Sequence, residues 1–386
     1  MQIFMSMKWL ENLGLEEPKS LDDFYNVLIA FKEQDANGNG DPNDEIPFLF
    51  TAKYGTIYSC TDVPVLWTHG IYSNTSSILG ITNLVNDDGQ FYCANTTENY
   101  KDYLKFMHRL YEEELMNQDF SIISSDERDL IIDENRAGIY ETGMINMDNL
   151  ELRDTMDPVA VNGFTSEYNP EKVVVSKRAS GGSIQVAINA ETEYAEEICK
   201  FLDYLCTEEG IISGANGYPG KTFEWKEVAG AQIPDHSPMA EAAGYGTDES
   251  SYRINEALPW DAFALVKADT GTIYTALANC STKEEMYADN LYAASGINAG
   301  KAVSFLEEGL VEKMDVPDLA YTAEEGSERS TLITDINNYH KIAYTQFING
   351  ELDIDADFDA YVAELEKIGL DRLLEIEQAA YDRMYK

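Results

Sequence analysis

Apolar side chains recur every three or four positions along much of the chain, and this spacing predicts amphipathic helices. Over residues 8–35 we expect a short helix, a turn, and a second helix that Ser20 caps together with Asp23. One face of that second helix is apolar and consists of Leu21, Phe24, Val27, Leu28 and Phe31. Further helical patterns cover residues 97–116, 191–210, 282–310 and 356–385.

Shorter apolar runs, bounded by Gly, Asn and Asp, predict strands between these helices. They lie at residues 46–50, 136–147 and 182–190, and a hairpin is expected over residues 82–93 around Asp-Asp-Gly. The third strand leads directly into the helix at 191–210 and follows the Gly/Ser stretch 180–183, where we expect the chain to pass between lobes. Strands that alternate with helices indicate an α/β fold.

Composition narrows the function classes. The 386 residues suit about two domains, and 70 acidic against 27 basic residues give a formal net charge of -43. Such a field repels nucleic acid and anionic membrane surfaces. The five Cys form no Cys-x-x-Cys pair, and the four His show no ligand-like spacing, which argues against a zinc site. No run approaches the roughly 20 apolar residues of a membrane span.

Residues 35–47 (DANGNGDPNDEIP) suggest an ion site. Acidic and amide side chains occupy positions 1, 3 and 5 and Gly40 occupies position 6, as in the first half of an EF-hand loop. The second half departs, because position 12 is Ile46 and the acids come earlier. We predict structural calcium bound by the side chains of Asp35, Asn37 and Asn39, by the carbonyl or side chain of Asp41, and by the carboxylates of Asp44 and Glu45.

An ordinary surface turn rich in Asn, Asp and Gly is the alternative, because Asx turns and positive φ explain each residue without a metal. The acids favour the ion, since four carboxylates within eleven residues repel one another when no cation is bound.

Several stretches resemble one known family. They are WLENLGLEEPKSLDDFYNVLIAFKEQDANGNGDPNDEIPF (9–48), TTENYKDYLKFMHRLYEEELMNQDF (96–120), SIQVAINAETEYAEEICKFLDYLCTEEG (183–210), GYPGKTFEW (217–225) and FINGELDIDADFDAYVAELEKIGLDRLLEIEQAAYDR (347–383). Together they resemble an extracellular solute-binding protein of a carbohydrate ABC transporter, of the large lipoprotein type with an EF-hand-like calcium loop.

The resemblance implies a periplasmic-binding-protein-like (type II) fold of two α/β lobes that close over a ligand. Residues 1–180 would form the second lobe with the calcium loop, and 181–255 the remaining part of the first. Residues 256–386 would form the hinge return and C-terminal helices that pack mainly on the second lobe. Members of the family begin with a signal peptide, a lipidated Cys and a long first stretch, which are absent here, so we expect the first lobe to be incomplete. The full-length form would be an extracellular, membrane-anchored lipoprotein.

An oligosaccharide is held by flat aromatic side chains and by polar groups for its hydroxyls. Candidates follow predicted strands or lie in isolated aromatic segments, although each aromatic alone is more often a core residue. The predicted ligand-binding residues are Tyr54, Tyr58, Trp67, Asn146, Asp148, Tyr218 and Trp260. Trp9 and Trp225 are expected to be packing residues.

The sequence is compatible with three functions. The first is the substrate-binding component of an ABC importer, a monomer without catalytic residues that captures an oligosaccharide and delivers it to the transmembrane permease subunits. The second is a carbohydrate-active enzyme, such as a glycoside hydrolase with a structural calcium site, which would need a suitably spaced pair of carboxylates. A calcium-dependent adhesion module is the third, and the absence of sequence repeats disfavours it.

Overall fold

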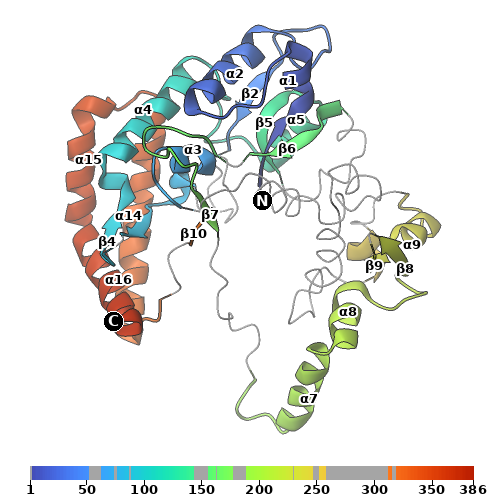
Figure 1. Ribbon diagram of the computed structural model, residues 1–386. Coiled ribbons are helices and arrows are strands. Elements are labelled where there is room, and N and C mark those ends of the chain that lie inside the picture. The colour runs from blue at the N-terminus through green and yellow to red at the C-terminus, as the bar shows by residue number, and fades with distance from the viewer. Residues whose placement is uncertain are drawn as a thin grey trace. The chain divides into compact units, whose positions relative to one another are not determined.

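The chain divides into two compact units, and Figure 1 labels the helices and strands of both. The computed structural model describes residues 2–51, 62–73, 76–86, 88–142, 155–161, 163–176, 188–228, 230–246, 252–257, 312–314 and 319–386. Unit 1 comprises Met1–Gly143, Glu151–Ser180 and Ser304–Lys386, and unit 2 comprises Met144–Leu150 and Gly181–Val303.

Unit 1 contains a four-stranded sheet. Its order is β2 (Ile46–Leu49), β5 (Ala137–Thr142), β1 (Gln2–Ser6) and β6 (Pro158–Ala160). Strand β1 lies antiparallel to both of its neighbours, whereas β2 runs parallel to β5. Successive residues Ile3, Phe4 and Met5 are all buried, so both faces of β1 are covered. The strand expected at 46–50 is confirmed as β2, and the strand expected at 136–147 is confirmed as β5 as far as its residues are described, while β1 was not predicted.

Helices α1 (Met7–Leu13) and α2 (Leu21–Glu33) follow the first strand. The predicted cap of α2 is confirmed, because Ser20 and Asp23 form a reciprocal capping box. Phe31 of α2 meets Trp9 of α1 edge to face, with ring centroids 5.1 Å apart. Both rings rest on β5 at Gly138, where a Cβ atom would lie 2.5 Å from Phe31 and 2.8 Å from Trp9. The glycine is therefore needed for this close approach.

Four longer helices form a second layer of unit 1 (Figure 1). They are α4 (Glu98–Glu112), α14 (Ala323–Ile348), α15 (Ile354–Ile368) and α16 (Leu370–Tyr385). Their apolar faces join one core with α2 and the sheet through residues such as Leu104, Tyr344 and Leu365. The helical tail expected at 356–385 is thus two helices, because Gly369 adopts a φ of +127° between them.

The described part of unit 1 also contains smaller elements. They are α3 (Val63–Thr68), the 3₁₀ turns η1 (Ser77–Leu79) and η2 (Ala94–Thr96), α5 (Ser125–Asp133), the hairpin β3 (Asn83–Val85) with β4 (Phe91–Cys93), and the parallel pair β7 (Val174–Ser176) with β10 (Glu312–Met314). The hairpin predicted over 82–93 is confirmed.

Unit 2 contains α7 (Ala195–Leu205), α8 (Glu208–Asn216), the antiparallel hairpin β8 (Glu224–Val228) with β9 (Ala231–Asp235), α9 (Ser237–Ala242) and the π-helix η4 (Arg253–Ala257). The single helix expected over 191–210 was wrong. Thr207 caps a new helix by accepting the Gly210 N–H at 3.1 Å, so the chain turns there. Cys199 of α7 and Cys206 at its end are both exposed and free.

The structure does not test two of the expected elements. The strand at 182–190 lies mostly, and the helical pattern at 282–310 wholly, outside the described residues. Among the helices that the structure describes, none combines the length and apolar character needed to cross a membrane.

Candidate functional site

The loop between α2 and β2, residues 35–45, is folded by successive Asx turns. Asn37 Oδ1 accepts the Asn39 N–H at 2.9 Å, and Asn39 Oδ1 accepts the Asp41 N–H at 2.7 Å. Gly40 supplies a φ of +96°, which glycine adopts without steric cost. Every second side chain therefore turns back onto the backbone and bends the chain into a tight coil.

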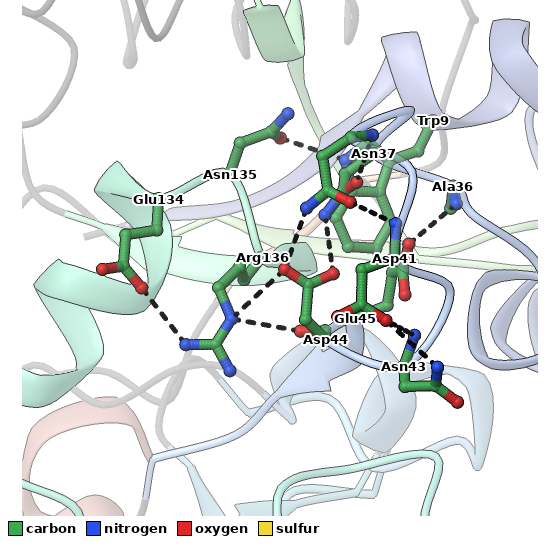
Figure 2. Close-up of polar contacts among 11 residues, drawn as sticks. Trp9, Ala36, Asn37, Asp41, Asn43, Asp44, Glu45, Glu134, Asn135 and Arg136 are labelled. Carbon is green, nitrogen blue, oxygen red and sulfur yellow. Dashed lines mark hydrogen bonds and ion pairs between the residues drawn. The ribbon is translucent and has the colours of Figure 1, made fainter.

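Asp44 lies at the centre of this coil (Figure 2). Its Oδ1 accepts the side-chain amide N–H of Asn37 at 3.1 Å, and its Oδ2 accepts that of Asn39 at 2.9 Å. The Arg136 guanidinium approaches from the residue that precedes β5, with Nε 3.2 Å from the Asp44 carbonyl oxygen and 3.8 Å from Oδ2. Three polar side chains thus converge on one carboxylate.

Two other carboxylates of the loop each keep one oxygen unsatisfied. Asp35 Oδ2 accepts the Gly40 N–H and Glu45 Oε1 accepts the Ala36 N–H, both at 3.0 Å. Asp35 Oδ1 and Glu45 Oε2 are buried without a hydrogen-bond partner. Burial raises the pKa of Glu45, and the negative charge of Asp44 adds to the effect. Buried, unpaired acceptors are costly, so these two oxygens are the places where a cation would be most favourable.

The donor set fits a hard cation, because the loop offers carboxylate, amide and carbonyl oxygens and two of them lack partners. The arrangement is nevertheless a self-paired one. Asn37 and Asn39 direct their amide N–H groups at Asp44, and no group of three or more His, Cys, Asp or Glu in the described part of the chain is placed to hold a metal. The predicted calcium ligands are thus brought into one loop, and their role stays a prediction.

Neighbouring elements hold the loop in place. Asn12 of α1 donates from Nδ2 to the Ala36 carbonyl at 2.9 Å. Where the loop ends, Ile46 N–H donates to the Arg136 carbonyl at 2.8 Å. The Trp9 indole N–H donates to Asn135 Oδ1 at 3.0 Å, which ties α1 to the same segment. Sequence reasoning missed Arg136, which lies 92 positions from Asp44; its only signal was its place at the start of the strand expected at 136–147.

The two described candidates for sugar binding differ in exposure. Trp67 is 2% exposed, and its indole N–H donates to the Ser73 carbonyl at 2.6 Å, so it is a packed residue here. Tyr218, before β8, is 55% exposed. The remaining candidates, Tyr54, Tyr58, Asn146, Asp148 and Trp260, lie outside the described residues. Packing is confirmed for Trp9, which is fully buried, whereas Trp225 is 41% exposed and contacts Phe223 edge to face.

No protein-family model matches the chain. Three characterised proteins are similar in sequence. Lipoprotein LipO of Bacillus subtilis is 30% identical over 226 residues, which cover 57% of this chain and 43% of LipO. The fructooligosaccharide ABC transporter substrate-binding protein FusA of Streptococcus pneumoniae is 26% identical over 98% of this chain and 65% of its own length. The polygalacturonan/rhamnogalacturonan-binding protein YtcQ of Bacillus subtilis is 27% identical over 60% of this chain and 46% of its own length.

Solved structures of solute-binding proteins superpose on this chain along almost its whole length. An extracellular solute-binding protein from Bifidobacterium longum subsp. infantis superposes with a TM-score of 0.72 at 23% identity, covering 100% of this chain and 74% of that one. The chain has the fold of a solute-binding protein. An EF-hand mutant of S. pneumoniae FusA, in complex with fructo-nystose, superposes with a TM-score of 0.62 at 20% identity and covers 99% of this chain and 72% of that one.

The resemblance and the α/β two-lobe fold class predicted from the sequence are therefore confirmed. The chain spans less than two thirds of the length of each of the three sequence relatives. The likenesses establish the family's fold, and they leave the calcium loop and the individual sugar-binding residues as predictions.

Proposed function

We propose that the chain acts as the substrate-binding component of an ABC importer and captures an oligosaccharide. The observation that carries this proposal is the alignment with FusA, a fructooligosaccharide-binding component of an ABC transporter, along 98% of the chain. YtcQ, which is named for binding polygalacturonan and rhamnogalacturonan, supports carbohydrate as the class of ligand, although its own ligands carry negatively charged uronic acids. The partners would be the oligosaccharide and the transmembrane permease subunits, with the chain itself a monomer.

The ligand would be a neutral oligosaccharide. A formal net charge of -43 disfavours a polyanionic ligand, because its negative groups would be repelled. Aromatic rings stack on the apolar faces of sugars, and the exposed ring of Tyr218 can serve in this way. The other proposed contacts, Tyr54, Tyr58, Asn146, Asp148 and Trp260, lie outside the described residues, and the buried Trp67 is no longer among them.

A structural calcium ion in the loop 35–45 belongs to the same proposal. The unpaired buried oxygens of Asp35 and Glu45 support it, since both would gain a partner. Asp35, Asn37, Asn39, Asp41, Asp44 and Glu45 would hold the ion. The loop connects α2 to β2 inside unit 1, so calcium bound there would stabilise the connection and take no part in chemistry.

A lipid anchor in the full-length protein is also proposed. The similarity to LipO, which is named a lipoprotein, supports an extracellular, membrane-attached location.

The glycoside hydrolase alternative is less well supported. Two of the three sequence relatives, FusA and YtcQ, are named as binding proteins. Among the described carboxyls, Asp62 has the environment of a proton donor, with a pKa raised by complete burial. It lies inside the core of unit 1, however, and pairs with Tyr103 there, so it faces no substrate.

Calorimetric titration of the chain against a panel of neutral glycans, including fructooligosaccharides, tests the proposal. We expect saturable binding without released reducing ends, and turnover of any glycan would contradict it. Tyr218→Ala should weaken binding about fivefold or more, in line with the loss of one aromatic contact. Tyr194→Ala is the matched control, because Tyr194 is 65% exposed in the same unit and is assigned no role.

A further inference from the structure

Arg136 is a basic residue that faces the loop 35–45 (Figure 2). Its Nε donates to the Asp44 carbonyl oxygen at 3.2 Å and lies 3.8 Å from Asp44 Oδ2. Its Nη1 donates to Glu134 Oε2 at 3.1 Å. The guanidinium therefore bridges the loop and the segment that leads into β5.

The backbone fixes where this guanidinium lies. Arg136 N–H donates to the Ile131 carbonyl at 3.0 Å, which closes the end of α5. Its carbonyl accepts the Ile46 N–H at 2.8 Å, at the point where β2 begins beside β5. Because both backbone groups are bonded, the side chain starts from a fixed point next to Asp44. About a third of the side chain is exposed, so its charge is only partly screened by solvent.

The contact between Arg136 and Asp44 affects the balance of charge in the loop. The loop carries four carboxylates, and their mutual repulsion opposes the tight coil. A positive charge at Asp44 offsets part of that repulsion when no cation is bound. A cation held by the same carboxylate would instead be repelled by the guanidinium.

We propose that Arg136 is an internal counter-cation of the loop, which stabilises the cation-free form and lowers the affinity for calcium. This inference rests on the proposed calcium site. It predicts two effects of opposite sign when the charge of Arg136 is removed: the cation-free protein becomes less stable, and calcium binds more tightly. If Arg136 served only to hold the fold, its replacement would lower both the stability of the cation-free protein and the affinity for calcium.

The test uses Arg136→Gln, which removes the charge, and Arg136→Lys, which keeps it. Arg372→Gln is the control, because Arg372 on α16 pairs with Glu328 and Glu375 and its replacement changes the net charge equally. Calcium affinity is measured by calorimetric titration of chelator-treated protein at low ionic strength, and Tm is measured in excess chelator.

We expect Arg136→Gln to lower the Kd for calcium about threefold to tenfold and to lower Tm in chelator. Arg136→Lys and Arg372→Gln should keep the Kd within about twofold of wild type, since the first retains the charge and the second does not touch the loop. An unchanged or higher Kd for Arg136→Gln overturns the proposal, as does an undiminished Tm in chelator. If the wild-type protein itself binds no calcium, the calcium site fails as well, so the two failures are distinguishable.

Discussion

Replacement of the buried Asp62 by Asn should stabilise the protein at neutral pH. Asp62 precedes α3 and is completely buried. Its Oδ2 accepts the Ser77 N–H at 3.2 Å and the Tyr103 hydroxyl at 2.5 Å. Its Oδ1 and the Ser76 hydroxyl are both buried and form no well-aligned hydrogen bond, although the Ser76 side chain is close enough to the carboxylate to oppose the rise in its pKa. The carboxylate thus carries one well-bonded and one poorly bonded oxygen inside the core.

Burial raises the pKa of Asp62 in the folded state. Below the ordinary pKa of an aspartate, both the folded and the unfolded chain hold the proton and burial of the carboxyl carries no charge penalty. As pH rises through that value towards the folded pKa, the unfolded chain releases its proton first, so the fold loses stability. The penalty is present in full above the folded pKa. Asn is neutral at every pH and removes this dependence.

The expected gain in the free energy of unfolding follows from the hydrogen bonds that the Asn side chain can form in place of the carboxylate. The Asn oxygen can keep both bonds that Oδ2 accepts, and its Nδ2 offers a donor to the Ser76 hydroxyl oxygen. Satisfying a buried group that lacks a partner is worth about 1 to 3 kcal/mol. We expect the free energy of unfolding at pH 7 to rise by about this amount and the gain to shrink near pH 4, where a protonated carboxyl can donate the same bond.

Urea denaturation followed by tryptophan fluorescence at pH 7 and pH 4 measures the change. The control is the double variant Asp62→Asn/Ser76→Ala, which should lose much of the gain because the acceptor is gone. A loss of stability at pH 7 in the single variant would refute the reasoning, since it would mean that an ionised carboxylate with charge-assisted bonds is the favoured form.

Three further outcomes test the fold and the loop. Gly138→Ala should lower the free energy of unfolding by about 1 to 3 kcal/mol in urea denaturation, because its Cβ meets Phe31 and Trp9; an unaffected midpoint would contradict that packing. Thr207→Ala should cost about 1 kcal/mol through the lost cap of α8, and Thr207→Ser should restore it. Calcium at about 100 times its Kd should stabilise chelator-treated protein by about 2.7 kcal/mol, and no shift in Tm would count against the site.

The features that the sequence predicted are local ones. Ser20, Asp23 and the apolar face of α2 lie within a few residues of one another, as do the Asx turns of the loop, so their chemistry is visible in a short window. Strand β1 was missed because its partners on β5 lie more than a hundred positions away and both its faces are buried, which removes any alternation.

In the candidate site, too, the features that depend on distant parts of the chain could not be predicted from the sequence. Trp67 and Tyr218 look equivalent in a sequence, yet one is 2% and the other 55% exposed, because exposure depends on which distant elements cover the ring. Asp62 gives no sign of its burial, since an aspartate before a helix is usually an exposed cap. Arg136 meets Asp44 only because β2 and β5 pair in parallel.

The contacts that hold the loop also bear on what calcium would do. Asn12 of α1 binds the Ala36 carbonyl, and the carbonyl of Arg136, just before β5, binds the Ile46 N–H, so both ends of the loop are held by the protein's own groups. The packing of Trp9 and Phe31 over Gly138 holds α1 and α2 on the sheet independently of the loop. A cation would therefore act on an already folded connection and relieve the unpaired oxygens of Asp35 and Glu45. For this reason we expect chelation to lower the stability of unit 1 while leaving its secondary structure in place.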